Sequence, residues 1–205
     1  MARVRIKMCG MTKEEDVVHA VSLGVDAVGF IFYGRSRRYI TPKQAQPLIR
    51  RLPAFVDAVG VFVNPTRDLV AEVLDLFPLQ HLQFHGEESP DFCTQFATPY
   101  IKTIAVSSLA AIEASARLHT NAAAVLLDTP SAHYGGTGTA FDWQLIPKHI
   151  ATPIILAGGL TPHNAKQACG YEPFALDVCS GVESEPGIKD HRKMNEFVQA
   201  VWGNL

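Results

Sequence analysis

Short apolar runs alternate with amphipathic segments along the whole chain. The apolar runs are unbroken rather than alternating, and they are rich in Val, Ile, Leu and Ala, which is typical of parallel strands buried on both faces. They occupy Val4–Met8, Val25–Phe32, Ala58–Val63, Leu79–Phe84, Ile101–Val106, Ala123–Leu127, Pro153–Ala157 and Phe174–Val178. The pattern therefore predicts a series of strands inside a core.

Each apolar run is followed by a segment with helical spacing of its apolar residues. These segments are Lys13–Leu23, Pro42–Leu52, Arg67–Phe77, Pro90–Phe96, Leu109–Leu118, Asp142–His149, Pro162–Cys169 and His191–Val201. Four of them carry helix-start signals: Thr12 with Glu15, Thr41-Pro42, Ser89-Pro90 and Thr161-Pro162. About eight strand–helix units predict an α/β fold, a single-domain (β/α)8 TIM barrel over residues 1–205.

An open, doubly wound sheet is the structural alternative. Such folds usually carry the pattern G-x-G-x-x-G after the first strand, whereas this chain reads C-G-M-T there. In the barrel, chemistry is expected at the carboxyl ends of the strands. Polar residues and glycines gather at those ends: Cys9, Asn64, His85, Asp128, Gly158-Gly159 and Ser180-Gly181.

Composition and charge narrow the possible partners. The chain of 205 residues is 47% hydrophobic with a net charge of −2, so no general attraction to nucleic acid or membranes is expected. No apolar run approaches the ~20 residues that cross a bilayer, and charged residues interrupt the first apolar run, which argues against a secretory signal. The four cysteines are scattered without a C-x-x-C pair, which favours a reducing, cytoplasmic setting and argues against a zinc ribbon.

Glycine-rich segments follow three of the predicted strands. "AGGLTP" and "CSGVE" follow the last two, the usual place for a phosphate in barrels, although tight turns alone would also explain these glycines. "HYGGTGTAFDW" follows the sixth strand, and its glycines suggest a lid that closes on a ligand, with an ordinary long loop as the alternative. The lid glycines are Gly135, Gly136 and Gly138.

Several single residues at the strand ends have both a chemical and a structural interpretation. Asp128 could act as a general acid, or it could cap a helix or join an ion pair. Cys9 could be reactive, although free cysteines are often core residues. His85 could contact a substrate or merely end a strand. One arginine of "FYGRSRRYI" could grip a carboxylate with its fork of N–H groups, while the others are solvated.

Taken together, the motifs resemble the phosphoribosylanthranilate isomerase family. The matching segments are "KMCGMT", "GFIFYGRSRRYI", "VGVFVN", "QFHGEE", "LLDT", "YGGTGTAFDW", "LAGGLTPHN" and "ALDVCSGVE…PGIKD". The resemblance implies an Amadori rearrangement in tryptophan biosynthesis that converts N-(5-phosphoribosyl)anthranilate to 1-(o-carboxyphenylamino)-1-deoxyribulose 5-phosphate. It implies no cofactor and no metal, a small phosphosugar substrate and either a monomer or a homodimer.

The resemblance also implies roles for individual residues. Cys9 takes the position of the general base and Asp128 that of the general acid. Arg38 would hold the anthranilate carboxylate, and His85 and Asp177 would line the substrate site. The phosphate would be held by Gly158, Gly159, Ser180 and Gly181. Departures from the family pattern are Gly34, Phe84 and Cys179, the last of which stands where serine is usual.

Two other classes of function are alternatives. One is another phosphate-binding barrel enzyme, such as a sugar-phosphate epimerase or a thiamine-phosphate synthase; a metal-dependent epimerase would need several His and Asp ligands at the strand ends, and the single histidine there is too few. A non-catalytic phosphosugar-binding barrel would also keep the glycine loops, but it would not need both Cys9 and Asp128.

Overall fold

Eight parallel strands close into a barrel, with β8 returning to pair with β1. The computed structural model describes residues 3–130 and 140–203. The barrel strands, in sequence order and also in spatial order, are β1 (Arg5–Cys9), β2 (Ala27–Ile31), β3 (Asp57–Phe62), β4 (His81–Phe84), β5 (Tyr100–Ala105), β6 (Ala124–Asp128), β7 (Ile154–Leu156) and β8 (Ala175–Val178). The predicted (β/α)8 barrel is confirmed.

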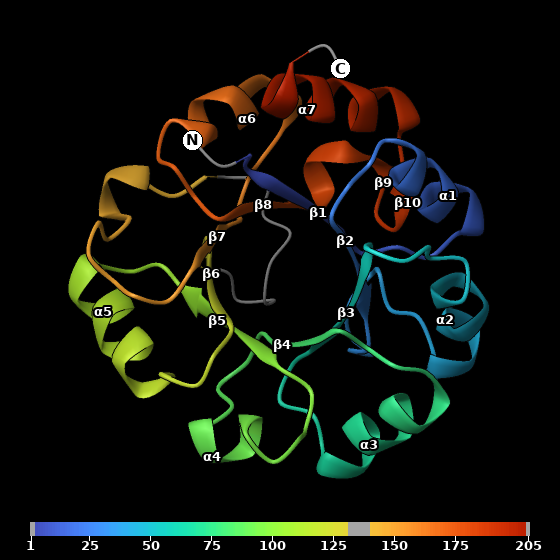
Figure 1. Cartoon of the computed structure of the whole chain (residues 1–205), viewed down its shortest axis with the longest axis horizontal. Coiled ribbons are helices and arrows are strands. Elements are labelled where there is room, and N and C mark those ends of the chain that lie inside the picture. The colour runs from blue at the N-terminus through green and yellow to red at the C-terminus, as the bar shows by residue number, and fades with distance from the viewer. Residues whose placement is uncertain (1–2, 131–139, 204–205) are drawn as a thin grey trace.

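Helices surround the barrel, as the view down its axis in Figure 1 shows. They are α1 (Glu14–Ser22), α2 (Pro42–Ile49), α3 (Arg67–Leu76), α4 (Pro90–Cys93), α5 (Leu109–Leu118), α6 (Pro162–Cys169) and α7 (His191–Trp202). The connection from β8 to α7 holds a short 3-10 helix, Ser180–Val182, and an antiparallel hairpin of β9 (Glu183–Glu185) and β10 (Ile188–Lys189). This hairpin was not predicted from the sequence.

Two predicted helices are shorter in the structure. The prediction of a helix over Asp142–His149 is wrong, because only a 3-10 helix over Trp143–Leu145 forms there. Inside an α-helix, Pro147 would have no backbone N–H to donate, and its ring would clash with the preceding turn. The residue before it, Ile146, has an extended backbone. The helix expected over Pro90–Phe96 ends at Cys93.

The helix-start signals are mostly confirmed. Thr12 is the exception, since α1 begins at Glu14 after Lys13, and the Thr12 hydroxyl instead donates to the carbonyl of Gly187. This bond ties the end of β1 to the β9–β10 hairpin. At the other three starts a side chain accepts from the backbone: Thr41 from Gln44, Ser89 from Phe92, and Asn164 from Thr161.

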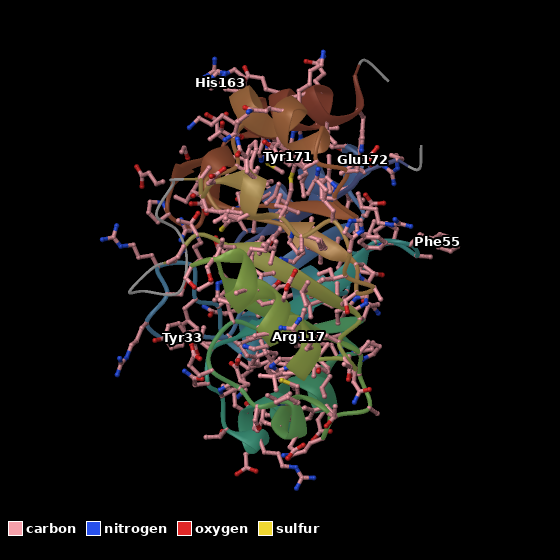
Figure 2. All side chains as sticks on the ribbon, turned by 90° about the vertical axis from the view of Figure 1, so that its left-hand side faces the viewer. Tyr33, Phe55, Arg117, His163, Tyr171 and Glu172 are labelled. Atoms are coloured by element: carbon pink, nitrogen blue, oxygen red, sulfur yellow. The ribbon has the colours of Figure 1, made fainter. Side chains whose placement is uncertain are left out.

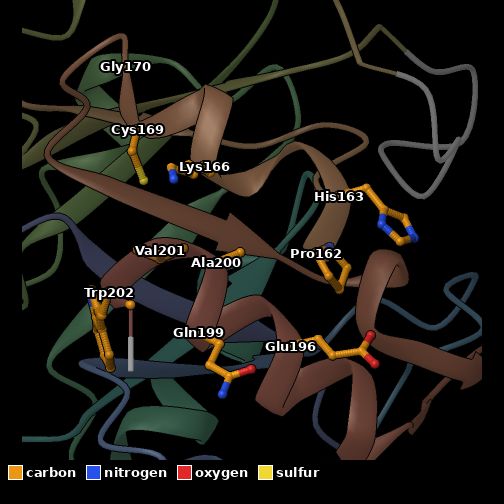
Figure 3. Close-up of a pocket in the computed structure, with 11 residues that line it drawn as sticks. Pro162, His163, Lys166, Cys169, Gly170, Glu196, Gln199, Ala200, Val201 and Trp202 are labelled. Atoms are coloured by element: carbon orange, nitrogen blue, oxygen red, sulfur yellow. The ribbon is translucent and has the colours of Figure 1, made fainter. Parts of the chain in front are cut away.

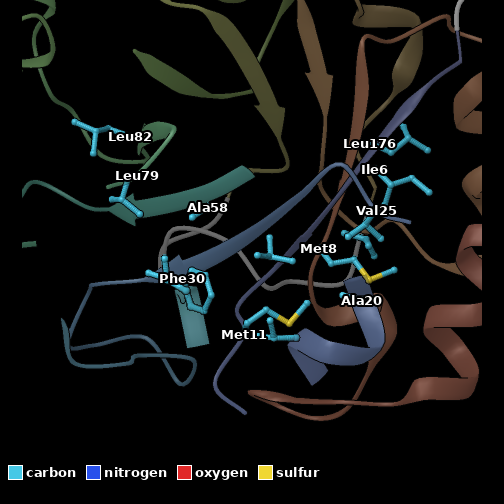
Figure 4. Close-up of a cluster of buried hydrophobic side chains, with 14 of the residues drawn as sticks. Ile6, Met8, Met11, Ala20, Val25, Phe30, Ala58, Leu79, Leu82 and Leu176 are labelled. Carbon is cyan, nitrogen blue, oxygen red and sulfur yellow. The ribbon is translucent and has the colours of Figure 1, made fainter. Parts of the chain in front are cut away.

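The apolar core has two layers, because successive side chains of a strand point to opposite sides of the barrel wall. Outside the wall, residues such as Met8 and Phe30 pack under the helices in a large buried cluster (Figure 4). Inside the wall lies a smaller cluster, made of Val59, Ile101, Ala124, Leu126, Ile155, Ala157 and Ala175. Buried polar side chains, among them Lys7, Gln83, Thr103 and Asp177, also lie on the inner side of the wall.

The two ends of the barrel are told apart by the residues on its loops. Figure 2 views the barrel from the side and shows Tyr33 and Phe55 at opposite ends. Tyr33 follows β2, so its end holds the carboxyl ends of all eight parallel strands and is called the mouth below. Within the described residues, no helix is long and apolar enough to cross a membrane.

Candidate active site

The mouth brings together residues that lie far apart in the sequence. Cys9 and Asp128 are the last residues of β1 and β6, and His85 directly follows β4. Asp177 lies within β8, two residues before Cys179, which follows the strand. The predicted base and acid are therefore both at the end of the barrel where the strands finish.

Asp128 and His85 are in direct contact across the mouth. Asp128 Oδ2 lies 3.3 Å from His85 Nε2, and both side chains are mostly buried. On its other side, His85 Nδ1 lies 3.3 Å from the amide nitrogen of Gln83. These two contacts hold the imidazole ring of His85 between Gln83 and Asp128. The second oxygen, Asp128 Oδ1, accepts from the backbone N–H of Thr129 at 2.7 Å.

Cys9 sits above a buried ion pair. Lys7 Nζ lies 2.9 Å from both carboxylate oxygens of Asp177, and its third donor position faces the Cys9 sulfur. Burial alone would lower the pKa of Lys7, but the charge of Asp177 raises it, so the lysine stays cationic. The space for both Lys7 Nζ and Cys9 Sγ exists because residue 29 is glycine, where a Cβ would lie 2.7 Å from that sulfur.

A second thiol lies beside Cys9. The Cys179 sulfur, at the end of β8, hydrogen-bonds with Cys9. This hydrogen bond, helped by the charges of Lys189 and Arg38, lowers the pKa of Cys179 to about 7. The same bond raises the pKa of Cys9, because Cys9 keeps the proton that the two sulfurs share, and burial adds to the effect. The pair therefore loses its first proton near neutral pH.

Arg38 is held by an acidic partner that the sequence did not reveal. Its Nε and Nη2 donate to the two oxygens of Glu183, at 2.8 and 2.7 Å. Burial alone would raise the pKa of Glu183, but the hydrogen bonds from Arg38 and the charge of Lys189 lower it. Arg38 thus reaches the mouth, next to Gly10 and Cys179, in one fixed orientation.

Lys189 joins this network from the β9–β10 hairpin. Its ammonium is fully buried, and it donates to Glu183 Oε1 at 3.0 Å, to the Cys9 carbonyl at 2.6 Å and to the Cys179 carbonyl at 3.2 Å. One side chain therefore fixes the ends of β1 and β8 relative to each other.

The two predicted phosphate loops touch each other. Gly158 and Gly159 both have positive φ, +78° and +62°, which favours glycine at these positions. A Cβ on Gly181 would lie 1.8 Å from the carbonyl oxygen of Leu160, so this close approach also requires glycine. Gly158 adjoins Asp128, since its Cβ would lie 2.9 Å from Asp128 Oδ1. The glycine loops and the predicted acid thus form one continuous surface.

Two expectations from the sequence concern a lid loop and a metal ion. The lid glycines Gly135, Gly136 and Gly138 lie outside the described residues. In residues 3–130 and 140–203, no three His, Cys, Asp or Glu side chains are grouped to hold a metal ion.

A separate groove of about 890 Å³ lies on the outside of the barrel between α6 and α7 (Figure 3). It is lined by Pro162, His163, Lys166, Cys169, Gly170, Glu196, Gln199, Ala200, Val201, Trp202 and Gly203. None of the predicted catalytic or substrate residues lines this groove. The chemistry expected from the sequence therefore belongs to the mouth rather than to this groove.

Sequence reasoning missed Lys7, Glu183 and Lys189. The sequence could have indicated Lys7, since a lysine inside a strand that is buried on both faces needs a buried partner of opposite charge. Glu183 and Lys189 had no local signal, because the hairpin that carries them was not predicted.

Fold and site together define a (β/α)8-barrel enzyme with an acid, a thiol and glycine loops at the carboxyl ends of its strands. The sequence model described as N-(5'-phosphoribosyl)anthranilate (PRA) isomerase matches residues 6–200. The N-(5'-phosphoribosyl)anthranilate isomerase of Legionella pneumophila is 48% identical over 204 residues, covering 98% of this chain and 99% of the relative. This chain belongs to the PRA isomerase family, the isomerases of tryptophan biosynthesis, as its sequence motifs had indicated.

Solved structures agree with this assignment. The crystal structure of phosphoribosyl anthranilate isomerase from Thermotoga maritima superimposes with a TM-score of 0.91 at 40% identity, covering 98% of this chain and all of that one. A phosphoribosyl anthranilate isomerase in complex with reduced 1-(o-carboxyphenylamino)-1-deoxyribulose 5-phosphate superimposes with a TM-score of 0.84 at 36% identity, again covering 98% and 100% of the two chains.

Proposed function

We propose that this chain converts N-(5'-phosphoribosyl)anthranilate to 1-(o-carboxyphenylamino)-1-deoxyribulose 5-phosphate, with Asp128 as general acid and Cys9 as general base. Membership of the PRA isomerase family supports the reaction. The observation that carries the residue roles is that an acid and a thiol, from strands β6 and β1, share the barrel mouth with the Lys7–Asp177 ion pair.

Ring opening comes first. The furanose oxygen is a poor leaving group, so it must gain a proton as the bond from C1' to that oxygen breaks, and the anilino nitrogen supplies the electron pair that forms an iminium. Asp128 delivers this proton. The contact with His85 Nε2 and the hydrogen bond from the Thr129 N–H hold the carboxyl group in one orientation.

Proton removal follows. The iminium makes the C2' hydrogen acidic, and the Cys9 thiolate takes that proton to leave an enolamine. The enolamine then tautomerises to the ketone, so no oxidant and no added electrophile are needed. Lys7 supports the anionic sulfur, because its ammonium lies against Cys9. General acid and general base catalysis each contribute about 10²–10⁴-fold.

Substrate binding uses two further groups of residues. Glu183 occupies Nε and Nη2 of Arg38, so we propose that Nη1 donates to the anthranilate carboxylate. The phosphate is proposed to bind Gly158, Gly159, Ser180 and Gly181. The positive φ values and the close contact between these loops depend on glycine, and without side chains the backbone N–H groups can approach an anion. Asp177 and His85 line the space between these two ends.

The remaining properties are proposals as well. We propose one catalytic domain over residues 1–205, a lid carrying Gly135, Gly136 and Gly138, and no nucleic-acid or membrane partner. The four free cysteines favour a reducing, cytoplasmic setting. A homodimer is a further proposal, supported by a 37% identical relative from Thermotoga maritima that is described as a dimeric enzyme made monomeric.

A fluorescence assay tests the function directly. The anthranilate group of the substrate is fluorescent, and its signal should fall as the purified protein forms product, with the same rate in buffer containing EDTA. A rate that EDTA abolishes would instead indicate a metal-dependent barrel enzyme. Binding of the phosphosugar without any loss of fluorescence would indicate a non-catalytic binding protein.

A further inference from the structure

The strand register places Cys179 directly opposite Cys9. Lys7 on β1 pairs with Asp177 on β8, and their side chains form an ion pair, so both point to the same side of the barrel wall. Cys9 and Cys179 are each two residues further along, and side chains two apart in a strand share a face. Neighbouring strands are about 4.8 Å apart, so the two sulfurs face each other at the mouth.

The contacts around the two sulfurs agree with this register. A Cβ on Gly10 would lie 3.0 Å from the Cys179 sulfur, and a Cβ on Gly29 would lie 2.7 Å from the Cys9 sulfur. Two glycines, one on each side, thus leave room for the pair. Gly10 also has a φ of +77°, a conformation that favours glycine.

Charged groups from every neighbouring element face the thiol pair, meaning Cys9 and Cys179. Cys9 is next to Lys7 and Asp177 in the barrel. The Cys179 sulfur lies 3.9 Å from Lys189 Nζ and 3.9 Å from Glu183 Oε1, with Arg38 alongside. The nearby groups are three cations and two carboxylates, and this excess of positive charge stabilises one negative charge on the pair.

We propose that Cys179 is the proton partner of Cys9 in this chain and acts through it as a positioning residue. This inference rests on the proposed role of Cys9 as the base. Before substrate reacts, the pair carries one proton and one negative charge. The proton moves from the Cys9 sulfur to the Cys179 sulfur, which leaves a Cys9 thiolate beside Lys7 and a neutral Cys179 thiol. The Cys9 thiolate then takes the C2' proton of the substrate.

The acid–base properties of the pair support one negative charge shared by the two sulfurs, with the proton resting on Cys9 until it moves to Cys179. The pKa of Cys179 is lowered to about 7 by the hydrogen bond from Cys9 and by the nearby cations. An isolated cysteine has a pKa of about 8.5, so only a few per cent would be ionised at neutral pH. Sharing one proton over two sulfurs therefore makes an anion available at a lower pH than an isolated cysteine does. Serine at position 179 could accept the hydrogen bond, but it could not take the charge.

The pH dependence of kcat for Cys179→Ser tests the proposal. We expect the acidic limb to move up by about one unit or more, so that kcat falls roughly tenfold at pH 6.5 and recovers near pH 9. KM should change little. The matched control is Cys169→Ser, a half-buried thiol in the outer groove, which should keep the wild-type profile. An unchanged acidic limb in Cys179→Ser would overturn the proposal, because a merely structural hydrogen bond is preserved by serine.

A second readout does not depend on turnover. The second readout is the rate at which iodoacetamide alkylates Cys9, followed by peptide mapping. In the wild-type protein this rate should rise with pH over the same range as kcat, and in Cys179→Ser the rise should occur at higher pH. Coincident alkylation profiles in the two proteins would also overturn the proposal. The failure of the underlying function looks different: a Cys9→Ser variant with wild-type kcat would remove Cys9 from the base role, whatever Cys179→Ser does.

Discussion

Asp128 Oδ2 lies 3.3 Å from His85 Nε2, although Asp128 ends β6 and His85 follows β4, and these two strands are separated in the barrel by β5. The sequence pointed to each residue separately, by its place after an apolar run and by the family resemblance, and did not pair them. The contact shows that strand-end residues of this chain converge on one place. It also fixes the carboxyl group of Asp128 toward the interior of the mouth.

Asp128→Asn is expected to lower kcat by at least about 100-fold, because an amide keeps the shape and can pair with His85 but cannot protonate the furanose oxygen. Binding of a reduced product analogue, measured by calorimetry, should stay within a few-fold of wild type. A variant that keeps near-wild-type kcat would remove Asp128 from the acid role.

Arg38→Ala is expected to weaken binding of the substrate by about 10- to 150-fold, since a charge-assisted hydrogen bond contributes roughly 1.5–3 kcal/mol. The effect should appear for ligands that carry the anthranilate carboxylate and be small for those without it. Arg37→Ala is the matched control, because Arg37 is exposed and adjoins Arg38 in the sequence. A larger effect from Arg37→Ala would show that the wrong arginine of the cluster had been chosen.

A buried ion pair behind the mouth gives a prediction about stability. Lys102 Nζ lies 2.9 Å from Glu88 Oε2, and the Glu88 carboxylate also accepts from the backbone of Asn64 and Gly86. Lys102→Met would leave that carboxylate buried without a counter-charge, which costs about 3–5 kcal/mol of unfolding free energy.

Urea unfolding measures this loss. The double variant Lys102→Met, Glu88→Gln removes both charges and should recover part of the lost unfolding free energy. A single Lys102→Met variant within 1 kcal/mol of wild type would contradict the idea that this pair holds the β4–α4 loop in place.

The barrel was predictable from the sequence because its signals are local. Unbroken apolar runs such as Ile101–Val106 mark strands buried on both faces, and Thr41-Pro42 marks a helix start wherever it occurs. The helix expected over Asp142–His149 failed for an equally local reason, since Pro147 prevents the segment from continuing as a helix.

The electrostatics of the mouth were less predictable, because they depend on residues brought together by the fold. Arg38 and Glu183 are 145 positions apart in the chain, and Lys189 reaches Cys9 across 180 positions. Cys179 appeared in the sequence only as a departure from the family pattern. Its contact with Cys9 follows from the closure of β8 onto β1, which local patterns do not reveal.

The turnover number of Cys9→Ser, measured by the fall in substrate fluorescence beside the wild-type and Cys169→Ser proteins, tests the proposed mechanism most directly. Serine fits the space of the buried Cys9 side chain, which is 5% exposed, but an alcohol is not ionised at neutral pH. We expect kcat to fall by about 10²–10⁴-fold in Cys9→Ser, with Cys169→Ser unchanged. A Cys9→Ser enzyme that turns over within a few-fold of wild type would contradict the assignment of the base.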